Sequence, residues 1–176
     1  MKHVISRWAM VPVIAAVVVF FDQWTKGLIE QSIPIGSGYA PIPALAPYFN
    51  LVHYTNTGAA FGILKGNSSL FVAIALVVCV AVLIYAKQLP VENWAVRACL
   101  GLQLGGAIGN NLFDRIQLGH VTDFLLFTLP VGDRVYAWPA WNVADGSIVV
   151  GVILMALLIL RQDRQERAVA ATAESC

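Results

Sequence analysis

Four long runs without a charged side chain constrain this chain more than any other feature of its sequence. They cover residues 8–21, 66–86, 98–113 and 146–160, and only the second reaches the ~20 residues that a helix needs to cross a hydrocarbon core. Each of the others must take in an ionisable side chain to cross. We therefore expect four transmembrane helices at about residues 8–30, 67–86, 94–114 and 140–160, within one membrane-embedded domain covering residues 1–176.

The composition agrees with a membrane protein. Hydrophobic residues make up 59% of the chain and charged residues only 12%, with a mean hydropathy of +0.73, whereas a soluble domain carries about 25% charged residues. The formal net charge of +1 offers no basic surface for a phosphate backbone, so we expect no nucleic acid partner. The predicted fold class is an α-helical integral membrane protein with four transmembrane helices, surrounded by membrane lipids.

Two connections should lie on the outer side of the membrane, at about residues 31–66 and 117–139. The first begins with proline and glycine turns and continues as an aromatic and β-branched stretch, Tyr48–Thr55, which has the composition of a short strand. The second contains a turn at residues 130–133. The two connections can pair, so we expect a small extracytoplasmic β-rich cradle, with residues 161–176 as a cytoplasmic tail.

The distribution of lysine and arginine predicts the orientation, because these residues favour the cytoplasmic side in short loops. Seven fall on the side of the chain ends, namely Lys2, Arg7, Lys87, Arg97, Arg161, Arg164 and Arg167. Four fall on the other side, namely Lys26, Lys65, Arg115 and Arg134. Both termini should therefore be cytoplasmic.

This topology gathers four carboxylates, Asp22, Asp114, Asp123 and Asp145, at one depth near the outer face. Carboxylates that share a partly apolar cleft cannot all ionise cheaply, so one of a close pair should hold a proton at neutral pH. Asp123 and Asp145 are the best candidates for such a pair, because Asp114 has the adjacent Arg115 as a charge partner. An acid beside a base can activate water and protonate a leaving amine, as in aspartic proteases.

Other interpretations use the same residue types. A proton relay also needs intramembrane carboxylates, so a four-helix proton-coupled carrier is the main alternative, although the sequence shows no clear inverted repeat or broken helix of the kind that carriers have. A structural membrane subunit is a third possibility, in which Asp22 and Lys26, one helical turn apart, form a structural ion pair. The sequence contains no His-Glu-x-x-His, Gly-x-Ser-x-Gly or glycine-rich phosphate motif.

Five blocks of the sequence resemble one family. They are Asp22-Gln-Trp-Thr-Lys26, Asn56-Thr-Gly-Ala-Ala-Phe-Gly62, Gly105-Gly-Ala-Ile-Gly-Asn-Asn-Leu-Phe-Asp-Arg115, Gly119-His-Val-Thr-Asp-Phe124 and Trp141-Asn-Val-Ala-Asp145. In this order, and over nearly the whole chain, they resemble the lipoprotein signal peptidases, the signal peptidase II family of bacteria.

The resemblance implies a multi-pass aspartyl endopeptidase of the bacterial inner membrane that removes the signal peptide from prolipoproteins directly before a diacylglyceryl-modified cysteine. The family's catalytic pair maps onto Asp123 and Asp145. Residues that bind substrate or support the site map onto Asn56, Gly58, Asn111, Asp114, Arg115, Asn142, Asp22 and Lys26. The resemblance also implies a site near the extracytoplasmic face, a globomycin-type peptide inhibitor, a monomer, and no metal or organic cofactor.

Two departures from the family pattern matter. Asn110 and Asn111 stand where one asparagine is usual, and we expect Asn111, three residues before Asp114, to face the site. Trp141 stands where phenylalanine is usual, a larger ring that would narrow the pocket. Residues 48–62 form a long outer segment that ends in glycines, so we also expect them to act as a mobile lid.

Overall fold

A computed structural model gives the positions of residues 9–58, 63–90 and 92–174. The helices are α2 (Met10–Ser32), α3 (Ser68–Gln88), α4 (Trp94–Ala107), the π-helix η3 (Ile108–Asp114), α5 (Arg115–Gln117) and α6 (Val143–Glu174), with a 3-10 turn η1 (Pro43–Leu45). The strands are β1 (Gly38–Tyr39), β2 (Phe49–Asn56), β3 (Val121–Val131) and β4 (Arg134–Ala137). Trp8, the expected start of the first helix, lies outside the described residues, as do the last four residues of the Asn56–Gly62 block.

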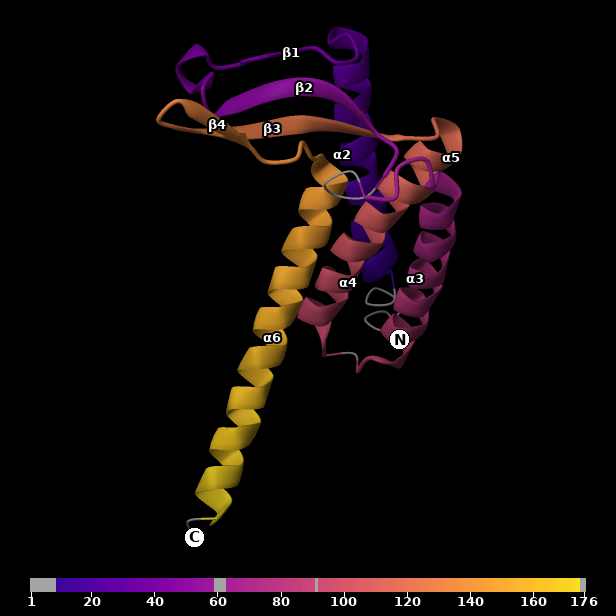
Figure 1. Cartoon of the computed structure of the whole chain (residues 1–176). Coiled ribbons are helices and arrows are strands. Elements are labelled where there is room, and N and C mark those ends of the chain that lie inside the picture. Colours follow the sequence, from indigo (N-terminus) through magenta and orange to yellow (C-terminus); the bar gives the residue numbers. More distant parts are fainter. Residues whose placement is uncertain (1–8, 59–62, 91, 175–176) are drawn as a thin grey trace.

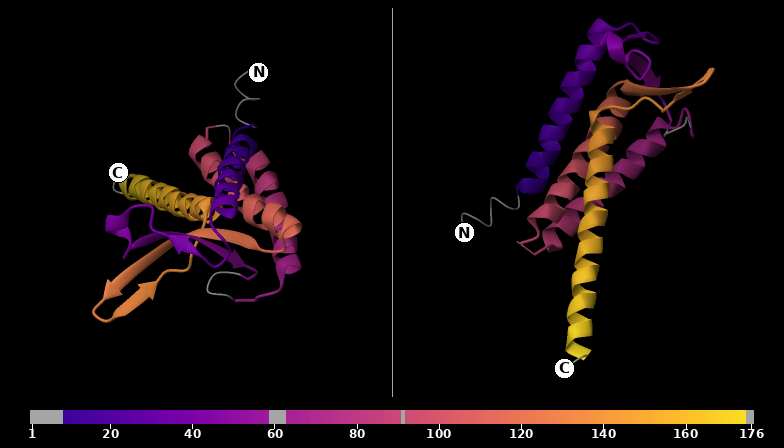
Figure 2. Two further views of the ribbon diagram at one scale, coloured as in Figure 1. Left: turned by 90° about the horizontal axis from the view of Figure 1, so that it is seen from above. Right: turned by 90° about the vertical axis from the view of Figure 1, so that its left-hand side faces the viewer.

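The helices form a bundle, and the sheet lies across one end of it (Figure 1). Helix α4 packs against α2, α3 and α6. The sheet has the order β1-β2-β3-β4, with antiparallel neighbours throughout. Seen from the side in Figure 2, the start of α2 and the end of α6 lie at the end of the bundle away from the sheet. The middle of α2 meets the start of α6, where the backbone N–H of Ala144 donates to Oδ1 of Asp22, and α2 then continues past this point alongside the sheet (Figure 1).

Within the described part of the chain, three helices are long and apolar enough to cross a membrane, namely α2, α3 and α6 as far as Ala168. The third helix expected from the sequence is not among them, because a π-helix begins after Ala107 and leaves α4 with 14 residues. The helical path itself continues through η3 and α5 to Gln117. Helix α6 continues to Glu174, through most of the stretch expected to be a tail.

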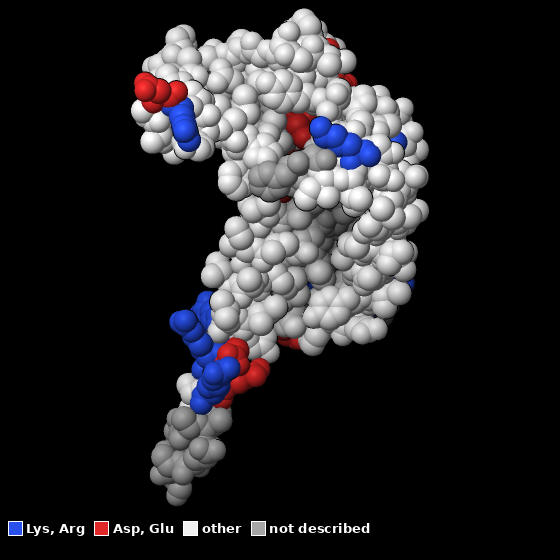
Figure 3. Space-filling model, in the orientation of Figure 1, with Lys and Arg blue, Asp and Glu red and all other residues white. Residues whose placement is uncertain are grey.

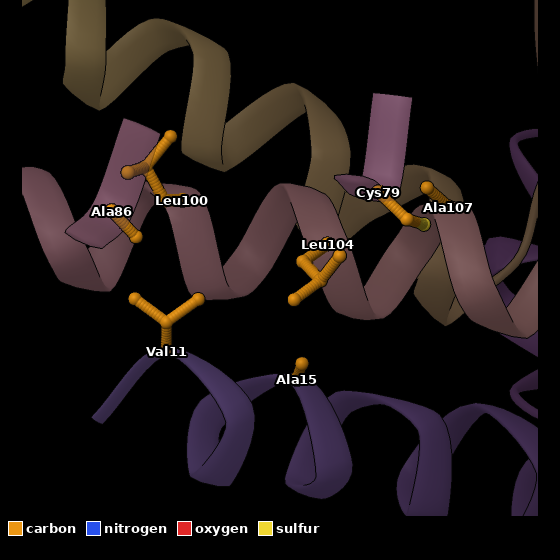
Figure 4. Packing of buried hydrophobic residues seen from close by; sticks show 7 residues of the cluster. All are labelled: Val11, Ala15, Cys79, Ala86, Leu100, Leu104 and Ala107. Carbon is orange, nitrogen blue, oxygen red and sulfur yellow. The ribbon is translucent and has the colours of Figure 1, made fainter. Parts of the chain in front are cut away.

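One face of α2 is buried along its whole length. Its buried residues recur at three- and four-residue spacing, as on one side of a helix; they are Val11, Ala15, Val18, Asp22, Lys26 and Ile29. The apolar half of this face packs against α3 and α4 in a cluster (Figure 4) of Val11, Ala15, Cys79, Ala86, Leu100, Leu104 and Ala107. The charged half continues toward the sheet. Packing of the apolar half therefore fixes the depth of Asp22 and Lys26.

Glycines let α2 and α6 approach α4 closely. A Cβ atom on Gly101 would lie 2.8 Å from the Cβ of Ile14, and one on Gly105 would lie 2.6 Å from the Cβ of Val18, both on α2. A Cβ atom on Gly151 of α6 would lie 2.9 Å from a backbone oxygen of α4. A larger residue at any of these positions would push the helices apart. This close packing brings the polar residues of three helices together.

A β-bulge bends β2 beside the helix bundle. The register between β2 and β3 shifts between Leu51 and Tyr54, and after the shift Tyr54 pairs with Asp123 and Asn56 pairs with Val121. Bulges of this kind redirect side chains and occur often next to active sites. Most of the segment expected to act as a lid is therefore strand, paired with β1 on one side and β3 on the other.

Candidate active site

Helix α6 begins with a capping box that also holds two acidic side chains. Asn142 precedes the first residue of α6, and its Oδ1 accepts a 2.9 Å hydrogen bond from the backbone N–H of Asp145. In return, Oδ2 of Asp145 accepts a 3.3 Å bond from the backbone N–H of Asn142. This reciprocal pattern satisfies N–H groups that a helix start leaves unpaired. Asn142 also donates from Nδ2 to Oδ1 of Asp123 at 2.8 Å, so one asparagine joins the two carboxylates.

Asp123 lies on β3 and is only 5% exposed. Its second oxygen, Oδ2, accepts a 3.1 Å hydrogen bond from Nδ2 of Asn56, at the end of β2. Burial raises the pKa of Asp123 to about 7, and the charge of Asp145 adds to this effect, while the hydrogen bonds from Asn56 and Asn142 oppose it. At neutral pH this carboxyl is therefore divided between its protonated and ionised forms.

Asp145 is linked to a buried lysine through Asn110. Nδ2 of Asn110 donates to Oδ1 of Asp145 at 2.7 Å, and Oδ1 of Asn110 accepts a 2.7 Å bond from Nζ of Lys26. The expectation that Asn111 faces the site is therefore wrong. Asn111 instead donates to the backbone oxygen of Ala107. The reason is the wide turn of η3, in which hydrogen bonds run from i to i+5. Asn110, four residues before Asp114, therefore lies on the same side of the helix as Asp114, and Asn111, three residues before it, does not.

Lys26 holds a polar cluster behind the two carboxylates. Its ammonium lies 2.6 Å from Oδ2 of Asp22 and 2.7 Å from Oδ2 of Asp114. Nζ donates hydrogen bonds to Oδ2 of Asp22 and to Oδ1 of Asn110, whereas its contact with Oδ2 of Asp114 is an ion pair without a hydrogen bond. Oδ1 of Asp22 accepts a 2.9 Å bond from the backbone N–H of Ala144 in the first turn of α6. The expected ion pair between Asp22 and Lys26 is present, and it also anchors the start of α6.

Arg115 supports the Asn56 turn and does not pair with Asp114. Its guanidinium donates to the backbone oxygen of Gly58 at 2.5 Å and lies 4.4 Å from the centre of the Phe71 ring. The N–H of Gly58 donates to Oδ1 of Asn56 at 3.0 Å. The expected pairing of Asp114 with Arg115 is wrong because consecutive helical residues point in different directions. Asp114 pairs with Lys26, and Arg115 holds the turn that positions Asn56.

A cleft of about 970 Å³ lies between the sheet and the first turns of α6, and both Asp123 and Asp145 line it. Figure 3 shows acidic atoms in this recess with basic atoms beside them, and a second acidic and basic group at the tip of the β3–β4 hairpin; the surface between the recess and the distal part of α6 is mostly uncharged. The remaining walls include Tyr54, Lys65, Trp138, Trp141, Ile148, Val149 and Val150. Of the four carboxylates that the topology gathers, two line the cleft and two are bonded to Lys26.

Several polar residues for which the sequence predicts no role also belong to the site. Nε2 of Gln23 donates to Oδ1 of Asp114 at 2.7 Å, and Oγ1 of Thr122 donates to Oε1 of Glu30 at 2.6 Å. The position of Gln23, directly after Asp22, was the only signal for the first contact. Among residues 9–58, 63–90 and 92–174, no group of three or more His, Cys, Asp or Glu side chains could hold a metal ion.

Comparisons with known proteins agree with one another. A family model described as signal peptidase (SPase) II matches residues 14–161. The lipoprotein signal peptidase of Desulfitobacterium hafniense is 36% identical over 161 residues, covering 91% of this chain and 96% of that protein. The lipoprotein signal peptidase of Caldanaerobacter subterraneus is 42% identical over 153 residues, covering 86% and 96%.

Two solved structures, each described as a bacterial membrane enzyme, have similar folds. Both are 32% identical to this chain, with TM-scores of 0.75 and 0.71. The first match covers 87% of this chain and 88% of the other, and the second covers 85% and 92%. The alternative of a proton-coupled carrier finds no support in these comparisons. The chain belongs to the signal peptidase II family and is a peptidase.

Proposed function

We propose that this chain removes the signal peptide from prolipoproteins directly before a diacylglyceryl-modified cysteine, as a membrane aspartic endopeptidase. The observation that carries the proposal is the pair of carboxylates, Asp123 and Asp145, joined through Asn142 at the wall of one cleft. Two carboxyl groups that share a site can act as acid and base together. Membership of a peptidase family and the names of the relatives supply the substrate class.

Asp145 serves as the base and Asp123 as the acid. Asp145 accepts hydrogen bonds from Asn110 and from the backbone of Asn142. Asn110 in turn is polarised by the ammonium of Lys26 at 2.7 Å, and donors of this kind favour the ionised form of a carboxyl. Asp123, with its pKa raised to about 7 by burial, carries a proton in a large fraction of molecules at neutral pH.

The reaction needs one water and no covalent change in the protein. The water oxygen bonds to the scissile carbonyl carbon, its proton passes to Asp145, and the proton of Asp123 passes to the carbonyl oxygen. As the carbon–nitrogen bond breaks, Asp145 gives its proton to the leaving amine and Asp123 regains a proton from the intermediate's hydroxyl. Asn56 has a second amide hydrogen, which can stabilise the developing oxyanion. The amide of Asn142 instead donates to Asp123 and to the backbone oxygen of Thr122, so Asn142 serves to hold Asp123 in place.

The cleft walls suit a substrate that is anchored in lipid. On α6 the wall is Ile148, Val149 and Val150, and at the rim Trp138 is 66% exposed. A diacylglyceryl group would keep the cysteine in the outer leaflet while the signal helix lies along α6. Apolar contacts far from the reacting bond would then hold that bond beside the two carboxylates.

The chain crosses the bacterial inner membrane four times, through α2, α3, the path from α4 to α5, and α6. Both termini are cytoplasmic and the cleft opens near the extracytoplasmic face. This orientation is supported by the arginines at 161, 164 and 167, which lie in the part of α6 distal to the sheet. Labelling of single cysteines on a cysteine-free background tests it. A C-terminus that is labelled from outside the cell would overturn both the topology and the position of the site.

The enzyme works as a monomer, because both carboxylates and their hydrogen-bond partners belong to one chain. A globomycin-type peptide should occupy the cleft and keep water from Asp123 and Asp145. The mass of the purified protein in detergent tests the monomer, and competition between the inhibitor and the substrate tests binding in the cleft.

The substrate assignment is tested with matched precursors that do and do not carry the diacylglyceryl group. Purified protein should cleave the modified precursor directly before its cysteine, as mass spectrometry of the products would show. The unmodified precursor should be cleaved much more slowly, because nothing anchors its cysteine in the outer leaflet. Equal rates for the two precursors would refute positioning through the lipid.

A further inference from the structure

A hydrogen bond attaches the strand that carries Asp123 to the end of α2. Thr122, the residue before Asp123, is 0% exposed, and its Oγ1 donates to Oε1 of Glu30 on α2 at 2.6 Å. A carboxylate can only accept hydrogen bonds, and a bond that it accepts from a hydroxyl is strong when its length is about 2.5–2.7 Å. The hydroxyl of Thr122 is therefore held in one orientation against the helix.

The neighbouring contacts also place one side of β3 against α2. Side chains two residues apart on a strand point to the same side, so Phe124 lies on the side of Thr122 and Asp123 lies on the other. Phe124 packs in a buried cluster with Ile29 and Ile33, at the end of α2. One side of β3 is thus attached to the helix, while the other side presents its carboxyl to the cleft.

This attachment matters because the sheet supports β3 weakly at this point. Strand β4 pairs only with residues 128–131 of β3, so among the described strands β2 alone pairs with Thr122 and Asp123. The bulge in β2 shifts the register directly before Tyr54, the residue that pairs with Asp123. Contacts with α2 must therefore help to fix this part of β3.

Thr122 also holds the asparagine that joins the two carboxylates. Nδ2 of Asn142 donates to the backbone oxygen of Thr122 at 3.3 Å and to Oδ1 of Asp123 at 2.8 Å. Oδ1 of Asn142 accepts the bond from the backbone N–H of Asp145. A displacement of Thr122 would therefore move the carboxyl of Asp123 through the backbone and disturb its alignment with Asp145 through Asn142.

We propose that Glu30 is a positioning residue for the cleavage reaction, which acts through Thr122 on the carboxyl of Asp123. This inference rests on the proposed function. Glu30 is exposed and is not part of the cleft wall, so it influences the reaction only through the threonine. A misplacement of about 1 Å can lower a rate about 10²-fold. Loss of this bond should therefore lower kcat and leave KM nearly unchanged.

The test removes the hydrogen bond from each end. Thr122→Val keeps a branched side chain without the hydroxyl, and Glu30→Ala removes the acceptor at an exposed position. Each should lower kcat for a diacylglyceryl-modified precursor about tenfold and leave KM within about twofold of wild type. The double variant should be no slower than the slower single variant, because only one bond is lost. Independent, multiplying effects would contradict the proposed contact.

Conservative variants and a matched control separate positioning from a general effect of substitution. Thr122→Ser keeps a hydroxyl and Glu30→Gln keeps an oxygen that can accept, so both should recover most of the rate. Thr128→Val is the control. Thr128 also lies on β3 and donates from Oγ1 to a backbone oxygen, that of Pro47, at 2.7 Å, but it is in the half of the strand away from Asp123. Its loss should leave kcat unchanged.

The free energy of unfolding in detergent is measured for every variant, and kcat is expressed per folded molecule. A bond that served stability alone would reduce the amount of folded protein without changing kcat per folded molecule. That result in Thr122→Val and Glu30→Ala would overturn the proposal, as would an equal loss of kcat in Thr128→Val. Failure of the folded wild-type protein to cleave the modified precursor would instead refute the proposed function, and with it this inference.

Discussion

Replacing Asp123 with asparagine should stabilise the protein above neutral pH even though it removes an active-site group. The carboxyl is 5% exposed, and its pKa is raised from 3.8 to about 7 by burial and by the charge of Asp145. An amide has nearly the same shape and never ionises. Its oxygen can still accept the 2.8 Å hydrogen bond that Asn142 donates.

The direction of this stability change follows from the number of protons that the folded and the unfolded protein bind at each pH. Because the pKa is higher in the folded state, the unfolded chain releases this proton first as the pH rises from about 4 to about 7, and wild-type stability falls over this interval. Above about pH 7 the wild-type protein has therefore lost ~4 kcal/mol of its free energy of unfolding, because each unit of pKa difference between the two states corresponds to about 1.36 kcal/mol. In Asp123→Asn the amide of Asn56 loses the oxygen to which it donates, and this loss offsets ~1 kcal/mol of the stability gained. Asp123→Asn should therefore be more stable than wild type by about 2–3 kcal/mol at about pH 8, and no more stable at about pH 4.

The assay is the free energy of unfolding in detergent micelles, measured for both proteins over a pH series. Asp163→Asn is a matched control, because Asp163 is 49% exposed and paired with Arg167 on the distal part of α6; it should show no pH-dependent gain. Cleavage by the wild type should also decline above about pH 7, as Asp123 loses its proton. A stability difference that is constant across the series, or a loss at about pH 8, would refute a buried Asp123 that holds a proton.

Two further predictions concern the polar cluster behind the cleft. Lys26→Met leaves Asp22 and Asp114 buried without their cation, so it should lower stability by ~3–5 kcal/mol and reduce the yield of folded protein; a yield and unfolding curve like those of wild type would contradict the ion-paired cluster. Asn110→Ala removes a hydrogen bond to Asp145 and should lower kcat about 10–100-fold, whereas Asn111→Ala should leave kcat within a few-fold of wild type. The reverse order in steady-state kinetics would mean that Asn111 is the residue that faces the site.

The outline of the fold could be predicted because it depends on composition over long stretches. Charge-free runs locate the apolar helices, and the aromatic and β-branched residues of Tyr48–Thr55 coincide closely with β2. The change from α-helix to π-helix after Ala107, within the expected third transmembrane helix, could not be predicted, because a π-helix has no marker in hydropathy. Its effect is local but decisive, since it turns Asn110 rather than Asn111 toward Asp145.

Of two side-chain pairings at the site, one could be predicted from spacing in the sequence and the other could not. Asn142 and Asp145 have the spacing of a capping box, so their mutual hydrogen bonds could have been predicted from the sequence alone. The partner of Asp114 could not, because adjacency in sequence suggested Arg115, whereas the glycine-mediated approach of α2 brings Lys26 to 2.7 Å. Such contacts depend on how closely two helices pack, which a single sequence does not specify.

Single-turnover assays on a diacylglyceryl-modified precursor show whether Asp123 and Asp145 together carry out the cleavage. Wild type and Asp163→Asn should cleave it at the same rate. Asp123→Asn and Asp145→Asn should each fold, bind the precursor and lose about 10³-fold or more of the cleavage rate, since an amide cannot exchange the proton. Cleavage by either cleft variant at a rate near that of wild type would contradict joint catalysis by Asp123 and Asp145.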